Sequence, residues 1–245
     1  KVAAMLPLSE GMPIERKAFF ELMASDQSKA LRHAFFAERD VAKVQGIEGV
    51  SPRPVKHVGV IGAGTMGAGI AVAFLDSGFA VTIIETSAEF LAKGRERIEG
   101  LYDRSLKSGR ITAETKAARL SKANFATDLA ALADADLVVE AVFEDMAVKK
   151  ELLARLEAVT RPDALLATNT SYLDINVMAE DLARPQNVVG LHFFSPANIM
   201  KLLEIVRAKK TAPDVLATAV SVGKALRKVA VVSGVCDGFI GNRVL

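Results

Sequence analysis

Apolar residues recur at helical spacing near the start of the chain. Within residues 14–44, Leu31, Ala34 and Phe35 fall on one face of a predicted helix. Residues 45–56 then combine glycine, serine and two prolines, a composition that disfavours helix. The pattern therefore predicts a helical segment over residues 14–44, followed by a linker.

From residue 57 onward, short apolar runs alternate with longer amphipathic segments. Near-continuous apolar strands with helices between them are typical of a parallel sheet that is covered on both faces. The sequence therefore predicts an α/β fold without internal repeats. The strands are expected over residues 57–61, 80–84, 136–142, 164–169 and 187–194.

The first predicted strand runs directly into a glycine-rich turn. Gly62, Gly64 and Gly67 form the pattern G-x-G-x-x-G between this strand and a helix. The first glycine permits the tight turn, the second lets the backbone approach a pyrophosphate, and the third lets the helix pack on the strand. Free N–H groups at the helix start then face the phosphates. This context predicts a Rossmann-type, doubly wound, mostly parallel sheet. The expected phosphate-binding residues are Gly62, Ala63, Gly64, Thr65, Met66 and Gly67.

The second predicted strand is followed by an acidic residue, Glu85. A carboxylate at this position can accept hydrogen bonds from the adenosine ribose, and it would repel a 2′-phosphate. Thr86 and Ser87 come next, with no arginine to bind such a phosphate. The sequence therefore favours NAD over NADP. A flavin or other dinucleotide site, or a nucleotide fold that has lost its ligand, is the alternative.

Composition limits the other partners. The net charge is +2, with basic and acidic residues interleaved, which gives no electrostatic case for nucleic acid or an anionic membrane surface. No apolar run approaches the ~20 residues that a membrane span requires. The single cysteine, Cys236, excludes an internal disulfide and suits a reducing compartment. We therefore expect a cytoplasmic protein, with an organelle matrix as the alternative.

A nicotinamide cofactor implies hydride transfer, which calls for an acid–base group beside the reacting carbon. Histidine is the usual choice because its ordinary pKa lies near neutrality. Of the three histidines, His33 lies in the N-terminal helical segment and His57 opens the first strand, far from the carboxyl ends where ligands bind. His192 lies near the end of a predicted strand, and it is the candidate base.

Glu204 occupies a second apolar run, where an unpaired carboxylate would be costly to bury. Pairing with His192 satisfies both side chains and gives a catalytic dyad, in which the glutamate fixes the tautomer and stabilises the imidazolium. We therefore expect two strands that face one cleft, separated by a turn over residues 195–199. The alternative for His192 is a hydrogen-bonded core residue without a catalytic role.

Five segments between residues 57 and 245 form an ordered set. They read GVIGAGTMGAGIA, DLVVEAVFEDMAVKKELLARLE, TNTSYL, LHFFSPANIMKLLEIV and CDGFIGNR. Together they resemble the signatures of the L-3-hydroxyacyl-coenzyme A dehydrogenases of fatty-acid β-oxidation. The resemblance covers about three quarters of the chain. It implies NAD-dependent oxidation of (S)-3-hydroxyacyl-CoA to 3-ketoacyl-CoA, with His192 as general base and Glu204 as its partner.

The resemblance also implies roles for other polar residues. Ser171 and Asn242 would contact the substrate oxygen or orient the base; taken alone, Ser171 is typical of a turn and Asn242 of a helix cap. Glu144 and Lys149 would lie near the nicotinamide-side ribose and phosphates. Taken alone, they are ordinary exposed charges at a helix start. Lys107 would lie near a coenzyme A contact.

Two departures from the family pattern point to multifunctional members. Ser195 stands where the family often has asparagine; we count it, with Ser171, among the expected cofactor contacts, since a hydroxyl can still donate. The segment VCDGFIGN, where many single-function members read TPGF, resembles enzymes in which a hydratase/isomerase domain precedes the dehydrogenase. Residues 1–54 likewise resemble the helical linker after that domain. The four phenylalanines of this segment would pack on that neighbour or on the dehydrogenase itself: Phe19, Phe20, Phe35 and Phe36.

The expected domains are a linker or tail of a hydratase-like domain (1–54), an NAD-binding domain (55–238) and the start of a C-terminal helical domain (239–245). The substrate is expected to be an acyl-CoA, the chain to pack against the hydratase and C-terminal domains, and a dimer to be possible. The 245-residue chain is expected to bind NAD but to oxidise substrate poorly. Two alternatives are a dinucleotide-binding module that is inactive without its C-terminal domain, and another hydroxy-acid dehydrogenase of the 3-hydroxybutyryl-CoA or 3-hydroxyisobutyrate type.

Overall fold

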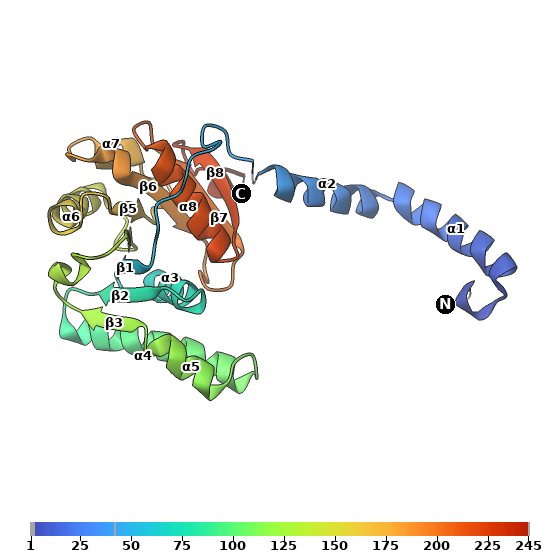
Figure 1. The fold of residues 1–245 in the computed structure, drawn as a ribbon, viewed down its shortest axis with the longest axis horizontal. Coiled ribbons are helices and arrows are strands. Elements are labelled where there is room, and N and C mark those ends of the chain that lie inside the picture. The colour runs from blue at the N-terminus through green and yellow to red at the C-terminus, as the bar shows by residue number, and fades with distance from the viewer. Residues whose placement is uncertain (1–2, 42, 245) are drawn as a thin grey trace. The chain divides into compact units, whose positions relative to one another are not determined.

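A computed structural model describes residues 3–41 and 43–244. Contacts divide the chain into two compact units, Lys1–Lys43 and Val44–Leu245. The smaller unit consists of a short 3₁₀ turn and two helices, which Figure 1 labels α1 and α2. These elements are η1 (Ala3–Met5), α1 (Leu8–Ala24) and α2 (Asp26–Asp40).

The continuous helix expected over residues 14–44 is interrupted at Ser25. Its extended backbone (φ −65°, ψ 152°) ends α1, and its hydroxyl accepts a hydrogen bond from the Ser28 N–H at 3.2 Å, which caps α2. The helix then ends at Asp40, short of the predicted boundary. Side chains of this unit that were expected to pack on a neighbour are about half exposed: Phe19, Phe20, Phe35 and Phe36.

The larger unit is built on an eight-stranded sheet in the order β3-β2-β1-β4-β5-β6-β7-β8 (Figure 1). The strands are β1 (His57–Ile61), β2 (Ala80–Ile84), β3 (Ala123–Ala126), β4 (Leu137–Glu140), β5 (Leu165–Thr168), β6 (Val188–Phe193), β7 (Leu202–Arg207) and β8 (Val229–Gly234). Strands β1 to β6 are parallel, whereas β7 runs antiparallel to β6, and β8 is parallel to β7. The first six strands have the order of the dinucleotide-binding fold, which confirms the predicted fold class.

Helices cover both faces of this sheet. One face carries α3 (Thr65–Asp76), α4 (Ala88–Lys107) and α8 (Pro213–Ala225), with α5 (Ala113–Leu120) at the edge. The other carries α6 (Met146–Val159), α7 (Ile175–Ala179) and the 3₁₀ turn η2 (Leu129–Leu132). Two further short elements are η3 (Pro185–Asn187) and α9 (Gly241–Val244).

Strand β4 shows why the strands are apolar throughout. Leu137 and Val139 pack into the core on one face, whereas Val138 packs into the core on the other. Successive side chains of a strand point to opposite faces, so a sheet with both faces covered needs apolar residues at every position.

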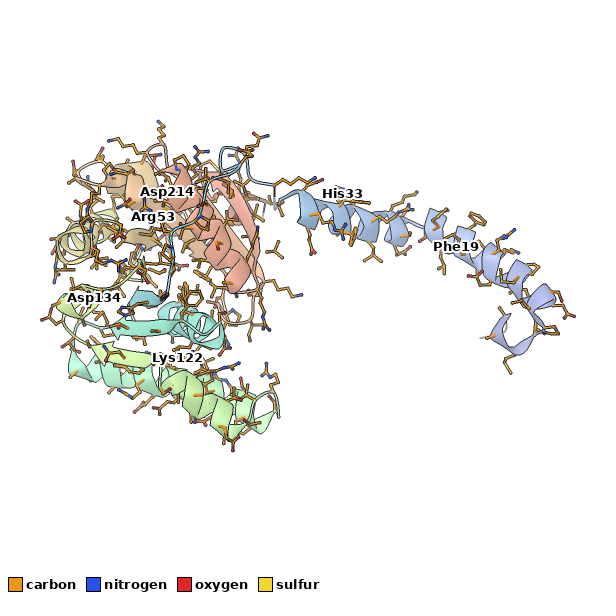
Figure 2. All side chains as sticks on the ribbon, viewed as in Figure 1. Phe19, His33, Arg53, Lys122, Asp134 and Asp214 are labelled. Carbon is orange, nitrogen blue, oxygen red and sulfur yellow. The ribbon has the colours of Figure 1, made fainter. Side chains whose placement is uncertain are left out.

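The predicted linker over residues 45–56 is part of the larger unit. Arg53 pairs with Asp214 of α8 at 2.8 Å, and Figure 2 shows the two side chains lying close together. Its backbone N–H donates to Thr218, and its guanidinium donates to Asn187. The sequence pattern could not reveal these partners because they lie far along the chain. The compact unit therefore begins before the predicted boundary at residue 55.

The Asp136 carboxylate binds the backbone at the start of β1. One carboxylate oxygen accepts the backbone N–H groups of Lys56 (2.7 Å) and His57 (2.9 Å), and the other accepts from Arg161 at 2.7 Å. Burial alone would raise the pKa of Asp136, but the hydrogen bonds from His57, Lys56 and Arg161 together hold that pKa below its usual value. The carboxylate therefore stabilises the fold in its ionised form.

We predict that Asp136→Asn lowers the free energy of unfolding at pH 7 by about 1–3 kcal/mol, because bonds to a charged acceptor are lost. A carboxylate whose pKa is lowered in the folded state stabilises the fold at pH values above its unfolded-state pKa of ~3.9. This stabilisation is lost as the pH falls through the folded-state pKa. The difference from wild type should therefore shrink between pH 5 and pH 2 in denaturant melts. Asp134→Asn, at an exposed neighbouring position labelled in Figure 2, is the control. A difference that stays constant with pH would contradict this account.

Candidate active site

The three glycines after β1 have different structural tasks. Gly62 has a φ of +89°, and a Cβ there would lie 2.9 Å from the Ala141 carbonyl oxygen. A Cβ on Gly67 would lie 1.7 Å from the Gly62 oxygen, so only glycine lets the helix pack this closely. A Cβ on Gly64 would meet no atom within 4 Å. Gly64 therefore faces open space at the start of α3, where a phosphate group fits.

The remaining residues of the predicted phosphate loop differ in exposure. Thr65 and Met66 form the first turn of α3, where backbone N–H groups lack helical partners. The Ala63 side chain is fully buried, so this residue presents only its backbone. These features fit the pyrophosphate cradle that the sequence predicts.

Glu85 directly follows β2, and its carboxylate binds the same loop. One carboxylate oxygen accepts the Ala63 N–H at 2.7 Å, and the other accepts the Thr86 N–H at 3.1 Å. Helix α4 supports Ala63 from the other side: Arg97 donates to its carbonyl oxygen at 3.1 Å, and a Cβ on Gly94 would lie 2.2 Å from its Cβ. Sequence reasoning missed Gly94 and Arg97, for which neither motif nor periodicity gave a signal.

A cavity of about 710 Å³ opens where the sheet order reverses between β1 and β4. Ligands bind at such switch points in doubly wound sheets. Its walls come from the carboxyl ends of β1, β2 and β4 and from α6. Its lining includes Gly62, Gly64, Glu85, Thr86, Ala141, Val142, Phe143 and Glu151. Together with the open space at Gly64, this cavity fits the adenosine half of a dinucleotide.

His192 and Glu204 are direct cross-strand partners in the antiparallel pair β6–β7. The His192 Nδ1 atom lies 2.6 Å from Glu204 Oε2, and the two residues are only 4% and 0% exposed. The other glutamate oxygen accepts the backbone N–H groups of Ile240 (3.0 Å) and Gly241 (2.7 Å). The carboxylate is thus satisfied on both oxygens. Within residues 3–41 and 43–244, His192 Nε2 has no hydrogen-bond partner.

Two aromatic rings pack against the imidazole. The centroid of Phe194 lies 4.5 Å from that of His192, and the centroid of Phe239 lies 5.9 Å away. Phe239 is buried and has a φ of +51°, rare for a bulky residue, and the turn that it forms leads directly to the N–H groups that bind Glu204. Gly241 is needed beside it because a Cβ there would lie 2.6 Å from Phe194 Cζ.

Ser171 and Asn242 are brought together from distant parts of the chain. The Asn242 side-chain amide, in α9, donates to the Ser171 carbonyl oxygen at 3.2 Å. The Ser171 backbone N–H donates to Glu144 Oε1 at 2.8 Å. Three predicted site residues therefore lie in one hydrogen-bonded group beside the end of β5.

Lys149 is not the exposed charge that its position in the sequence suggests. It is 1% exposed, and its ammonium lies 2.8 Å from both carboxylate oxygens of the fully buried Glu140. Sequence reasoning missed Glu140. For the burial of Lys149 one signal was available, because Lys149 shares a helical face with Leu153 and Leu156, which are both buried.

The structure does not join Lys107 or Ser195 to these groups. Lys107 is exposed at the last residue of α4, a helix that starts just after β2 and extends for about 30 Å. Ser195 is exposed in the turn after β6. In the described part of the chain, no hydrogen bond links either side chain to the dyad. No helix there combines the length and hydropathy needed to cross a membrane.

Comparisons with known proteins agree with this geometry. Residues 57–236 match the family described as "3-hydroxyacyl-CoA dehydrogenase, NAD binding domain". The chain is 42% identical over 250 residues to a peroxisomal bifunctional enzyme of Cavia porcellus, covering 100% of this chain and 34% of the relative. It is 43% identical over 235 residues to a peroxisomal fatty acid beta-oxidation multifunctional protein of Oryza sativa, covering 95% and 32%. The chain thus spans about a third of the length of these relatives.

Solved structures give the same picture. The 3-hydroxybutyryl-CoA dehydrogenase of Escherichia coli K12 superposes with a TM-score of 0.77 at 41% identity, covering 78% of this chain and 41% of the other. The dehydrogenase part of multifunctional enzyme 1 from C. elegans gives a TM-score of 0.70 at 33% identity, covering 76% and 43%. The chain therefore belongs to the 3-hydroxyacyl-CoA dehydrogenase family, and residues 57–236 are its NAD-binding domain.

Proposed function

We propose that this chain is the NAD-dependent dehydrogenase part of a multifunctional β-oxidation enzyme, which oxidises (S)-3-hydroxyacyl-CoA to 3-ketoacyl-CoA. The observation that carries the proposal is the His192–Glu204 pair, buried at the carboxyl edge of a sheet whose neighbouring strands form a dinucleotide site. The family membership and the names of the relatives support this substrate class.

In this proposal His192 is the general base. Glu204 accepts the Nδ1 proton of His192, which leaves Nε2 with a lone pair for the 3-hydroxyl proton. Bound NAD would accept the hydride that leaves C3 of the substrate. After proton transfer, the Glu204 carboxylate stabilises the imidazolium. Phe194 and Phe239 keep water away from the ring, which strengthens both interactions.

The polar residues near the dyad would then orient the substrate and the cofactor. The Ser171 hydroxyl and the Asn242 amide can donate to the substrate oxygen as it becomes a carbonyl. The loop Gly62–Gly67 would hold the pyrophosphate, and Glu85 the adenosine ribose. Ser195 as a cofactor contact and Lys107 as a coenzyme A contact stay predictions.

We also propose that further domains complete the site. Large apolar side chains are exposed around the dyad's edge of the molecule, which suits a covering domain or an acyl chain. They are Tyr172, Ile199, Met200, Ile240 and Val244. The relatives are about three times as long as this chain, which leaves room for the hydratase and C-terminal helical domains that the family resemblance implies. A dimer and the compartment stay predictions; the relatives' names favour a peroxisomal matrix over the expected cytoplasm.

The competing functions differ in substrate. Because the chain is similar to a 3-hydroxybutyryl-CoA dehydrogenase, a short-chain preference is the nearest alternative. NADH absorbance with 3-hydroxybutyryl-CoA, a long-chain 3-hydroxyacyl-CoA and free 3-hydroxyisobutyrate separates these activities. NAD binding without turnover of any of them, in the full-length protein, would favour a binding module.

We predict that His192→Gln lowers kcat of the full-length protein by about 10²–10⁴-fold, the usual contribution of a general base. The Kd for NADH should change by less than about threefold, because the base does not hold the cofactor in this account. NADH absorbance and fluorescence titration measure the two quantities. His57→Gln is the control, since His57 bonds Thr82 at the opposite end of the sheet. Normal turnover of the His192 variant would exclude it as the base.

We predict that Glu85→Ala weakens NAD binding about tenfold, because the ribose loses an acceptor and the Ala63 N–H loses its partner. Discrimination against NADP should fall, since the repelling carboxylate is gone. Titration with NADH and NADPH tests both. Glu89→Ala, at an exposed position on α4, is the matched control. An unchanged ratio of the two affinities would show that Glu85 does not select the cofactor.

A further inference from the structure

Residues 194–201 form the turn between β6 and β7, the two strands that carry the dyad, and they are called the dyad turn below. The Pro196 carbonyl oxygen accepts the backbone N–H groups of Ile199 and Met200, both at 2.9 Å, a pattern typical of a single helical turn. The later carbonyl oxygens of such a turn have no helical partner and carry partial negative charge. A cationic side chain placed there can bind them.

Lys228 supplies this cation. Its Nζ atom donates to the Ala197 carbonyl oxygen at 2.5 Å and to the Met200 carbonyl oxygen at 2.6 Å. Hydrogen bonds from a charged donor are stronger than those between neutral groups. One partly buried side chain therefore holds the dyad turn at two points three residues apart.

The end of α8 brings Lys228 to this place. Arg227, the residue before it, has a φ of +55°, a left-handed conformation that commonly ends helices. The Lys228 backbone N–H donates to the Gly223 carbonyl oxygen at 3.0 Å, and Val229 opens β8 by donating to the Lys201 carbonyl oxygen at 2.8 Å. Because Lys201 ends the dyad turn, the chain reversal between α8 and β8 sets Lys228 beside that turn.

Helix α3 packs against the same turn. Ala197 is buried, and a Cβ on Gly69 of α3 would lie 3.2 Å from the Ala197 Cβ and 3.3 Å from the Ala197 nitrogen. This close fit leaves little room for the turn to shift toward α3. Ala197 is thus held by a hydrogen bond from Lys228 and by a packing contact with Gly69.

Phe194 connects the dyad turn to the dyad itself. The centroid of its ring lies 4.5 Å from that of His192, and a Cβ on Gly241 would lie 2.6 Å from its Cζ atom. The Gly241 N–H in turn donates to Glu204 at 2.7 Å. Phe194 therefore packs against the proposed base and against a donor to its carboxylate partner, so a shift of the turn would disturb both.

We infer that Lys228 is a positioning residue for the dehydrogenase reaction, whose two bonds to backbone carbonyl oxygens hold the dyad turn so that Phe194 stays packed against His192. This inference rests on the proposed function and deepens it. Lys228 acts only through the turn and touches neither substrate nor cofactor.

Two substitutions in the full-length protein test this role. Lys228→Met keeps a side chain of similar length without a donor, whereas the guanidinium of Lys228→Arg can still donate to both carbonyl oxygens. Lys224→Met is the matched control, because Lys224 is exposed in the last turn of α8. NADH absorbance gives kcat, and fluorescence titration gives the Kd for NADH. Both are measured at a temperature at which thermal melting shows every variant to be folded.

Lys228→Met should lower kcat about tenfold, because small displacements of catalytic groups are costly in rate. The Kd for NADH should stay within about threefold of wild type, since the phosphate loop is not part of the dyad turn. Lys228→Arg should keep kcat within about threefold of wild type, and Lys224→Met should leave it unchanged.

Wild-type kcat in Lys228→Met would overturn the inference, and so would a kcat of Lys228→Arg as low as that of Lys228→Met. A loss of NADH affinity as large as the loss of kcat would assign Lys228 to the cofactor site and overturn it as well. Absence of turnover in the wild-type full-length protein would instead count against the proposed function.

A crystal structure of the wild-type protein gives a second readout that does not depend on the folding of the variants. The Lys228 Nζ atom should lie within hydrogen-bond distance of the Ala197 and Met200 carbonyl oxygens, with Phe194 against the His192 ring. A Lys228 side chain directed into solvent, with the turn in the same place, would overturn the inference.

Discussion

The proposed chemistry depends on one reversal of strand direction, between β6 and β7. Strands β1 to β6 are parallel, and their carboxyl ends meet at the same edge of the sheet. Consecutive parallel strands need a long crossover connection, whereas an antiparallel strand can follow a short turn. The antiparallel β7 returns immediately, and its register sets His192 opposite Glu204. Directly opposite side chains in such a pair have Cβ atoms about 4.5–5.5 Å apart, which is the distance an imidazole–carboxylate bond needs.

The hydrophobic pattern fixes this register. On β7, Leu203 and Ile205 pack into the core beneath α8, so Glu204 between them must point to the other face. On β6, Leu191 and Phe193 pack into the same core, so His192 between them also points to the other face. A slip of one residue would turn the glutamate toward the aliphatic side chains of α8, and it would turn Leu203 and Ile205 toward the face that carries the dyad. The same alternation that builds the core therefore assembles the dyad.

Two buried carboxylates at this edge of the sheet, Glu204 and Glu140, are held in the same way, by a basic side chain together with backbone N–H groups. Glu204 is bonded by His192 and two backbone N–H groups, and Glu140 is bonded by Lys149, a hydroxyl and one backbone N–H. Each carboxylate therefore has hydrogen-bond donors at both of its oxygens, as a buried polar group requires. Glu204 also joins β7 to the turn at Ile240 and Gly241, and Glu140 joins β4 to α6 and β5. The donors that bind each carboxylate therefore also fix the positions of the neighbouring chain segments.

The strength of the local pattern explains what could be predicted from the sequence. Strands β1 and β2 match their predicted limits, and the dyad follows from two polar residues in apolar runs. Strands β3 and β8 were missed because they lie at the edges of the sheet and are only partly buried, so their composition carries little signal. The contacts of Arg53 and the pairing of Lys149 with Glu140 depend on partners from other elements, which neither spacing nor composition reveals.

The position of the proton on the neutral His192 ring, measured by ¹⁵N NMR in the wild-type protein with NAD bound, tests the role of the dyad. We expect a protonated Nδ1, hydrogen-bonded to Glu204, and an unprotonated Nε2 that can accept the substrate proton. A neutral ring that carries its proton on Nε2 would contradict the proposed role of the dyad.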